Sequence, residues 1–332
     1  MIKTSKNKWR PKIWVLVDNR LGNANQALAL ADKLADNYQI KKIHYNCLVN
    51  LPNFVLGLWP IHIKKSILNE LAAEDVPDII ISAGRRTASL AVYLKKLSKN
   101  KSKIIQIMRP GLDPSEFELI ILPQHDNYQY TLPNVVRVIG ALNNIQTRMP
   151  AAKAMLEDNY PDIKHFIAVI IGGSNRRYNF TLKNAKILAN SLKTISENHS
   201  LPLFITFSRR TPKQIKEIFK EKFLWPNVIY DPEEDLPNPY PGIIGAAEYI
   251  VTTTDSISMC SEAASTGRPI YVFCPANFTL KKHRFFIQQL VDLNIVQRLD
   301  SSTSFLVKYN YAPLHEIDKV AEIVKKQVLI NS

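Results

Sequence analysis

The sequence predicts an α/β protein with two doubly wound, parallel sheets that face a central cleft, followed by a C-terminal helix. The chain has 332 residues, more than one hydrophobic core usually serves, so two domains are expected. Short runs rich in Val, Ile and Leu recur without polar alternation, which is typical of strands buried on both faces of a sheet. Helix-period stretches separate these runs, as they do in doubly wound folds.

The predicted elements alternate in each half of the chain. Strands are expected at residues 13–17, 40–45, 78–82, 104–108, 119–122 and 135–139, and then at 166–171, 203–207, 227–230, 249–252 and 270–274. Helices with one apolar face are expected at 23–36, 85–97, 181–196, 212–223, 256–266 and 313–329. The pattern restarts near Phe166, after a charged helical stretch. We therefore expect an acceptor-side domain at 1–150 and a nucleotide-binding domain at 151–332 that includes the terminal helix.

Composition indicates a folded protein with a strong positive charge. The hydrophobic fraction of 46% and charged fraction of 22% are ordinary for a globular protein. The net charge of +14 predicts affinity for polyanions or anionic lipid surfaces, or it reflects a lysine-rich proteome. The three cysteines show no metal-ligand spacing, so a reducing compartment and no bound metal are expected. No recognition motif accompanies the charge, so nucleic acid is not an expected partner.

Hydropathy predicts a cytoplasmic protein. No apolar run reaches the ~18 residues of a spanning helix, and the basic start lacks the apolar core of a signal peptide. Membrane contact is then limited to the surface. The segment Leu51 to Lys65 combines Phe54 and Trp59 with lysines, which suits an interfacial patch on the inner face of the membrane. A buried connection is the alternative.

Polar loops follow most of the predicted strands. Five of the 10 glycines lie in these loops, namely Gly22, Gly84, Gly111, Gly172 and Gly173. Ligands of open parallel sheets bind at the carboxyl ends of the strands, so the loops together predict a site for an anionic, nucleotide-type ligand. For any single loop, a strand-to-helix turn that needs glycine explains the residue equally well.

The loop G-G-S-N-R-R-Y and the loop S-R-R-T-P follow two strands of the second half. Glycines there would free backbone N–H groups for phosphate oxygens, and the polar side chains add donors. The residues expected to bind phosphate are Gly172, Gly173, Ser174, Asn175, Arg176, Ser208 and Arg209. Neither loop is G-x-G-x-x-G or a Walker A loop, so hydride transfer to a dinucleotide and P-loop ATP hydrolysis are disfavoured.

The segment T-T-D-S-I-S-M-C-S-E-A, residues 253–263, carries the densest polar pattern. Asp255 or Ser256 would cap the helix that follows. Ser256 and Ser258 then lie in its first turn, where N–H groups and the helix dipole favour an anion. Glu262 shares a helix face with Ser258 and would bind ribose hydroxyls. The alternative is a capped amphipathic helix with a solvated glutamate.

This segment, extended through T-G-R-P-I-Y-V-F, resembles the signature of the "elongated mitochondria" fission-factor family, which plants share with bacteria. The stretches D-N-R-L-G-N-A-N-Q, S-A-G-R-R-T, P-Q-H-D and G-G-S are similar in order and spacing, over most of residues 12–310. A wider resemblance is to GT-B-like glycosyltransferases with two Rossmann-like domains, through S-x-x-x-E-A followed by G-x-P. It implies a nucleotide sugar, with Gly172, Gly173 and Ser174 near the diphosphate and Glu262 on the ribose.

These observations lead to the hypothesis that the protein transfers a sugar from a nucleoside-diphosphate sugar, without a metal ion. A UDP sugar is the favoured donor. The acceptor is unknown, and a membrane lipid would fit. Asp18 follows the first strand and is the preferred general base, with His125 and Asp126 as rivals. Asp18 as a turn residue and His125 as a surface histidine are the alternatives. The first loop lacks the Gly-Gly-His pattern of lipid-linked peptidoglycan transferases, which leaves the acceptor side open.

Three further interpretations remain open at the level of sequence. A nucleotide-sugar epimerase would use the same site, and a non-enzymatic membrane-associated adaptor would keep the fold without the chemistry. The acidic stretch at residues 231–235 would bind a divalent ion or, as we prefer, form a solvated loop.

Overall fold

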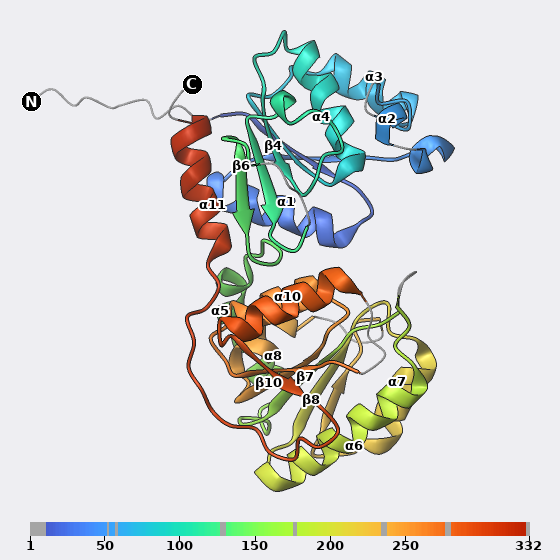
Figure 1. Cartoon of the computed structure of the whole chain (residues 1–332), viewed down its shortest axis with the longest axis vertical. Coiled ribbons are helices and arrows are strands. Elements are labelled where there is room, and N and C mark those ends of the chain that lie inside the picture. Colours follow the sequence, from blue (N-terminus) through green and yellow to red (C-terminus); the bar gives the residue numbers. More distant parts are fainter. Residues whose placement is uncertain are drawn as a thin grey trace, which may run out of the picture. The chain divides into compact units, whose positions relative to one another are not determined.

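The computed structural model describes residues 11–51, 53–56, 59–126, 131–174, 178–233, 238–275 and 280–329, without the side chains of Asn53 and Phe54. The chain forms two compact units, Met1–Val138 with Glu316–Ser332 and Ile139–His315 (Figure 1). Each contains a six-stranded parallel sheet. The two doubly wound α/β units that the sequence predicts are therefore present.

The first unit has the strand order β2-β1-β3-β4-β5-β6. Helix α4 packs on one face through a core that includes Trp14, Ile80 and Leu90, while α1 contacts β1, β3 and β4. Its elements are β1 (Ile13–Val17), α1 (Leu21–Leu34), β2 (Gln39–Lys42), η1 (Cys47–Asn50), α2 (Asn53–Leu56), α3 (Lys65–Ala73), β3 (Ile79–Ala83), α4 (Arg85–Leu97), β4 (Lys103–Ile107), η2 (Pro114–Glu116), β5 (Leu119–Pro123), β6 (Val135–Val138), α11 (Glu316–Val324) and the π-helical turn η3 (Lys325–Leu329).

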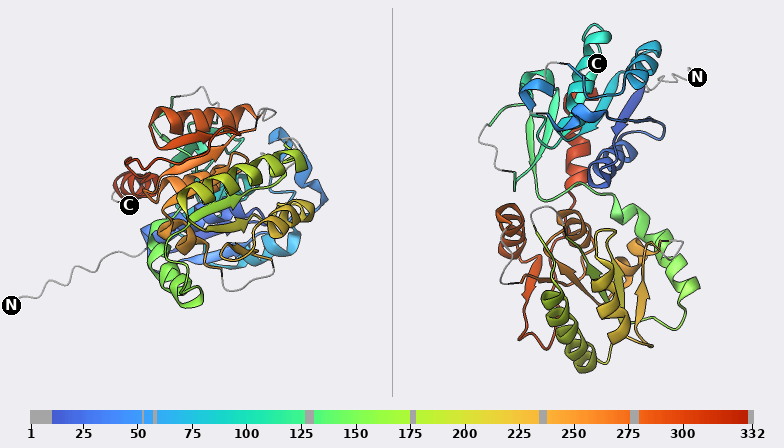
Figure 2. Two further views of the ribbon diagram at one scale, coloured as in Figure 1. Left: turned by 90° about the horizontal axis from the view of Figure 1, so that it is seen from below. Right: turned by 90° about the vertical axis from the view of Figure 1, so that its right-hand side faces the viewer.

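The second unit has the strand order β12-β11-β10-β7-β8-β9. Figure 2 shows helices on both sides of its sheet. Its elements are α5 (Ile145–Asn159), β7 (Ile167–Ile171), α6 (Leu182–His199), β8 (Leu203–Phe207), α7 (Lys213–Lys222), β9 (Val228–Tyr230), α8 (Tyr240–Ala246), β10 (Tyr249–Thr253), α9 (Ile257–Ala264), β11 (Ile270–Phe273), α10 (Lys281–Asp292) and β12 (Val296–Leu299).

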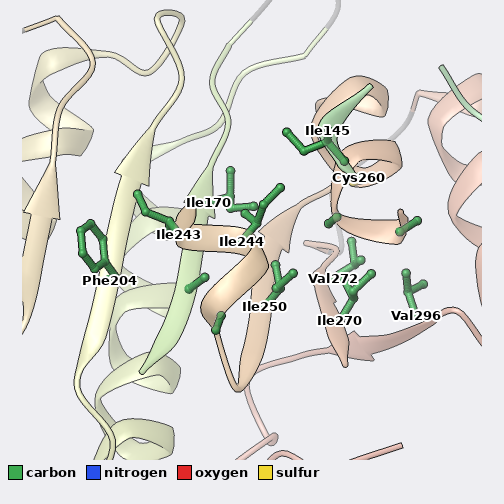
Figure 3. Close-up of a cluster of buried hydrophobic side chains, with 14 of the residues drawn as sticks. Ile145, Ile170, Phe204, Ile243, Ile244, Ile250, Cys260, Ile270, Val272 and Val296 are labelled. Carbon is green, nitrogen blue, oxygen red and sulfur yellow. The ribbon is translucent and has the colours of Figure 1, made fainter. Parts of the chain in front are cut away.

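The strands of the second unit are buried on both faces because successive side chains enter two different cores. Ile170, Ile250 and Val272 pack with α5, α8, α9 and α10 (Figure 3). Their neighbours Val169 and Val251 pack on the opposite face with α6 and α7. This double burial explains why the strands read as continuous apolar runs.

The observed division between the units differs from the expected one at residue 150. Helix α5 belongs to the second unit, where Gly242 of α8 approaches the Ala152 carbonyl so closely that a Cβ would collide with it. Helix α11 belongs to the first unit rather than the second, and Asp318 there lies 2.7 Å from Lys33 of α1. Helix α11 is amphipathic, but its sequence does not indicate which core its apolar face covers.

Each sheet has one position at which the chain reverses its direction of travel across the strands. In the first sheet this switch point lies between β1 and β3, and in the second between β7 and β10. Loops on either side of such a point diverge towards opposite faces and leave room for a ligand at the carboxyl ends of the strands. The two switch points are therefore the positions at which polar residues can contact a ligand.

Candidate nucleotide site in the second unit

Two loops from the predicted site meet at the switch point of the second sheet. The Gly172 N–H donates to Thr253 Oγ1 and the Gly173 N–H donates to Asp255 Oδ2, both at 2.8 Å. Thr253 Oγ1 also donates to Asp255 Oδ1 at 2.6 Å. The loop after β7 and the segment after β10, far apart in the sequence, are thus joined by a buried hydrogen-bond network.

The two glycines serve this close approach. A Cβ at Gly172 would collide with the Asp255 carboxylate, and one at Gly173 with the Arg210 backbone. Their N–H groups bind protein oxygens, which differs from the free amides that the sequence led us to expect. Asp255 is only 2% exposed, and burial raises its pKa against the lowering effect of its hydrogen bonds and of Arg210. In the structure, Asp255 holds the backbone of the loop after β7 through the Gly173 N–H.

The other residues predicted to bind phosphate differ in their environment: some bond to neighbouring protein groups, some are exposed, and some lie outside the described residues. Ser174 Oγ donates to Asn179 Oδ1 and accepts from the Phe180 N–H. Ser208 Oγ accepts from the Arg210 N–H, and Arg209 is exposed beside it. Asn175 and Arg176 lie outside the described residues, as does Arg177. The loops after β7 and β8 are neighbours, because these strands pair in the sheet.

Helix α9 begins at this switch point. Of the two cap candidates, Asp255 and Ser256, the structure shows Ser256. Ser256 is the N-cap, with Oγ accepting from the Met259 N–H at 3.4 Å. Ser258 lies in the first turn and is half-buried. The first amides of a helix have no partner within the helix, so the start of α9 offers N–H groups and the positive end of its dipole to an anion.

Glu262 lies further along α9 and is half-buried rather than solvated. The Tyr240 hydroxyl donates to its Oε2 at 2.9 Å. Burial raises the pKa of Glu262 to about 7, although the Tyr240 hydrogen bond and the Arg148 charge act in the opposite direction. A carboxylate with one oxygen held by a tyrosine can accept a ligand hydroxyl with its other oxygen, since each oxygen carries two lone pairs.

A cavity of about 470 Å³ adjoins this segment at the carboxyl ends of β10 and β11. Thr254 and Cys274 line it from the strands, and Lys281, Arg284 and Arg298 contribute three positive charges. Among the described residues its lining includes no Asp or Glu. The sequence interpretation missed these cations. The run K-K-H-R at the start of α10 was the available signal, but α10 itself was not predicted.

The three predicted bases lie in the first unit. Asp18 Oδ1 accepts from the Arg20 N–H at 2.9 Å, which is the turn interaction, and Oδ2 accepts from the Tyr45 hydroxyl at 3.0 Å. His125 is 7% exposed, so the surface-histidine alternative is wrong, and Asp126 follows it. Strands β3 and β4 lie between β1 and β5. This separation of ~14 Å prevents one hydroxyl from contacting both Asp18 and His125.

The acidic stretch after β9 is only partly solvated where the structure describes it, because Glu233 is exposed and Asp231 is buried. Asp231 is 1% exposed, and Lys216 Nζ lies 2.9 Å from its Oδ1 and 2.6 Å from Glu233 Oε2. Within the described ranges, no group of three or more His, Cys, Asp or Glu side chains is placed to hold a metal ion. These carboxylates instead compensate a buried lysine.

The segment Leu51 to Lys65 is partly buried, as a connection would be, and partly exposed, as an interfacial patch would be. Leu56 and Ile63 are 2% exposed and form part of the core, whereas Trp59 is 67% exposed and Ile61 is 41% exposed. The Phe54 side chain and Leu58 lie outside the description. No helix in the described part of the chain is both long and apolar enough to span a bilayer.

Comparison with solved structures identifies the fold. The UDP-GlcNAc 2-epimerase of Methanocaldococcus jannaschii matches 95% of this chain and 99% of its own, with a TM-score of 0.61 at 16% identity. The Neisseria meningitidis UDP-GlcNAc 2-epimerase bound to UDP-GlcNAc also gives 0.61, at 14% identity, over 96% and 100% of the two chains. Acinetobacter baumannii MurG gives 0.53 at 12% identity, over 95% and 100%. The two Rossmann-like units are those of the GT-B-type fold.

Comparison of sequences identifies the family. "Uncharacterized protein RP120" of Rickettsia prowazekii is 44% identical over 96% of this chain and 99% of its own length. "Mitochondrial fission protein ELM1" of Arabidopsis thaliana is 30% identical over 77% of this chain, which spans 65% of the plant protein. The family model described as "Mitochondrial fission ELM1" matches residues 21–328. The chain therefore belongs to the mitochondrial fission ELM1 family.

Proposed function

We propose that the second unit binds a nucleoside-diphosphate sugar and that the protein transfers the sugar, without a metal ion, to an acceptor. The observation that carries this proposal is Glu262, a half-buried carboxylate on the helix that starts at the switch point between β7 and β10. A nucleotide needs an anion site and, about two helical turns away, an acceptor for ribose hydroxyls. Helix α9 presents both.

The charges around α9 suit a diphosphate. The start of α9 favours an anion, and Arg210 beside it is 46% exposed and only partly engaged by Asp255, at 3.6 Å. The cavity next to Thr254 adds the three cations of α10 and β12. Two structures with the same fold are described as bound to UDP-GlcNAc, which supports a UDP sugar as the first ligand to test.

The reaction would form a bond between the acceptor oxygen and the anomeric carbon. The bond from that carbon to the diphosphate oxygen breaks, and the nucleoside diphosphate leaves with the electron pair. The acceptor proton passes to a base, for which we propose Asp18. Charge that develops on the leaving diphosphate is stabilised by the start of α9 and by Arg210 and the cavity cations.

Isothermal titration with UDP, UDP-GlcNAc and the matching GDP ligands tests this function. At pH 8, where Glu262 is ionised, we expect one site that binds a UDP ligand and that weakens by about tenfold or more in Glu262→Gln, because a ribose hydroxyl loses a charged acceptor. Glu248→Gln is the matched control, since Glu248 precedes β10 at the opposite end of the strand and pairs with Lys308 at 2.7 Å. Absence of binding at millimolar ligand would sink the proposal.

Product analysis separates the related interpretations. A transferase releases nucleoside diphosphate only when an acceptor is added, whereas an epimerase interconverts the nucleotide sugar with no acceptor. In the adaptor interpretation no sugar is transferred or epimerised, and Glu262→Gln leaves the cellular function of the protein unchanged. Epimerisation or adaptor behaviour would replace transfer as the assigned function.

A further inference from the structure

Three arginines gather at the switch point of the first sheet, near Asp18, the proposed base, and in a different unit from the proposed nucleotide-binding residues. Arg20 is the N-cap of α1 and closely follows β1. Arg85 and Arg86 are the first two residues of α4 and closely follow β3. Strands β1 and β3 pair side by side. We call Arg20, Arg85 and Arg86 the arginine cluster.

The position of the arginine cluster is electrostatically unfavourable in the absence of an anion. The first turn of a helix carries the positive end of the dipole, and acidic residues are favoured there. Helix α4 has no acidic residue in its first turn, and its N-cap, Gly84, supplies no side-chain cap. Burial lowers the pKa of Arg86, and the charges of Arg20 and Arg85 act in the same direction. Such a local conflict is typical of a functional site.

One carboxylate, Asp18, partly offsets this charge. Its oxygens already accept from the Arg20 N–H and from the Tyr45 hydroxyl. Asp18 and the arginine cluster together carry a net charge of about +2, since arginine stays protonated and aspartate ionised near neutral pH. The charge balance therefore leaves room for a dianion.

The arginines are held in place by the segment that leads into α3. Arg85 Nη1 donates to the Leu51 carbonyl at 3.3 Å, and Arg86 Nη2 donates to Asn50 Oδ1 at 3.4 Å. The Arg86 guanidinium lies 5.6 Å from the centre of the Tyr45 ring, which stacks on His62. Side chains restrained before a ligand arrives lose less entropy when they bind it.

His62 is a buried residue that is hydrogen-bonded to the backbone of the arginine cluster. It is 0% exposed, and its Nε2 must donate to the Arg86 carbonyl at 2.7 Å, because a carbonyl can only accept. Burial and the two arginines lower the pKa of His62, so the ring is neutral. Its Nδ1 then carries a lone pair, and no described residue donates to it. This lone pair can accept from a hydroxyl or from a protonated phosphate oxygen, but not from a dianion.

Gly84 permits the backbone to form this corner. Its φ is +80°, and a Cβ would lie 2.6 Å from Asn23 Nδ2. Only glycine fits both restraints without strain. The first amides of α4 follow at once, so N–H groups and guanidinium groups occupy the same end of the sheet.

We propose that the arginine cluster and the start of α4 bind a phosphate group, either a phosphomonoester or the end of a diphosphate. Guanidinium groups match phosphate in planar, two-point geometry, and helix amides add further donors. The phosphate belongs to a small molecule or to a lipid headgroup. The proposal is independent of nucleotide-sugar binding, since every residue involved belongs to the first unit.

Titration of the full chain with inorganic pyrophosphate tests the site for a soluble ligand. The variant Arg85→Gln with Arg86→Gln should bind at least about tenfold more weakly, because it loses two charge-assisted donors. The matched control is Lys96→Gln with Lys101→Gln, two exposed lysines at the far end of α4 and just beyond it. A second control, Lys281→Gln with Arg284→Gln, removes cations of the second unit. If the double variant unfolds, Arg20→Gln replaces it, because Arg20 is exposed; this variant should also bind pyrophosphate more weakly than wild type.

Vesicles test the lipid source. Phosphatidylcholine vesicles that contain phosphatidic acid, a phosphomonoester, are compared with vesicles that contain phosphatidylglycerol, a phosphodiester. Loss of pyrophosphate binding in the arginine variants but not in the lysine variant supports a soluble ligand, and loss of retention on phosphatidic acid in the arginine variants but not in the lysine variant supports a lipid. Equal binding by the arginine and lysine variants in both assays overturns the proposal, as does loss confined to the second-unit variant. Retained UDP binding by the arginine variants would show that the second unit is intact.

Discussion

The Gly173 N–H donates a 2.8 Å hydrogen bond to Asp255 Oδ2, and this bond joins the ends of β7 and β10. Thr253 donates to the other carboxylate oxygen, and Arg210 lies 3.6 Å from Oδ2. A buried carboxylate with three donors around it holds two loops in a fixed relation. One wall of the proposed nucleotide site is therefore a rigid backbone corner rather than a flexible glycine loop.

We predict that Asp255→Ala lowers the free energy of unfolding of the second unit by about 2–4 kcal/mol, because it leaves buried donors of Gly173 and Thr253 unsatisfied. Urea denaturation measures the change. Asp113→Ala is the control, since Asp113 is an exposed cap of η2 whose loss should lower the free energy of unfolding much less. Equal losses in the two variants would show that the Asp255 network does not stabilise the corner.

The sequence predicted the fold well because burial on both faces leaves a direct record in continuous apolar runs. Strand β12 escaped prediction because Gln297 and Arg298 interrupt its short apolar pattern and are exposed. Helix α8 escaped because Pro241, Gly242 and Gly245 make it a poor local helix, which tertiary packing on α5 overrides.

The site was predictable in position but not in detail. Strand order was needed to show that the loops after β7 and β10 are neighbours, whereas those carrying Asp18 and His125 are separated. Local residue types indicated phosphate-binding glycines, yet Gly172 and Gly173 are required by the approach of Asp255 and Arg210. Such long-range contacts leave no trace in a short motif.

Glu262 should make stability depend on pH. Burial raises its pKa from 4.5 to about 7, so the folded protein favours the protonated acid. The stabilisation from this group is complete below pH 4.5 and is lost as the pH rises through 7. We predict that Glu262→Gln is more stable than wild type by roughly 1–3 kcal/mol at pH 8 and about equal to it at pH 4.5. Thermal denaturation at the two pH values measures this difference. A variant less stable than wild type at pH 8 would contradict the prediction.

The proposed base can be separated from its rivals by position. We predict that Asp18→Asn lowers kcat for sugar transfer by about 100-fold or more, whereas Asp126→Asn has little effect, because β3 and β4 separate the two sites. Steady-state release of nucleoside diphosphate with a responsive acceptor measures both variants. UDP affinity should stay unchanged in each. The opposite ranking of the two variants would move the base to the end of β5.

Trp59 is an exposed aromatic residue in the segment that the sequence suggests for membrane contact. Trp59 and Ile61 are exposed beside Lys64 and Lys65, so an apolar side chain can enter the interface while the lysines meet anionic headgroups. Each such lysine contributes about 1 kcal/mol near an anionic surface. We predict that the protein floats with anionic vesicles and that Trp59→Asp reduces the bound fraction by about tenfold. Trp225→Asp is the comparison variant, because Trp225 and Leu224, 71% and 70% exposed, form a second exposed apolar pair; loss of flotation in this variant instead would assign membrane contact to the second unit. Equal flotation of the two variants would mean that net positive charge alone, rather than this segment, brings the protein to the surface.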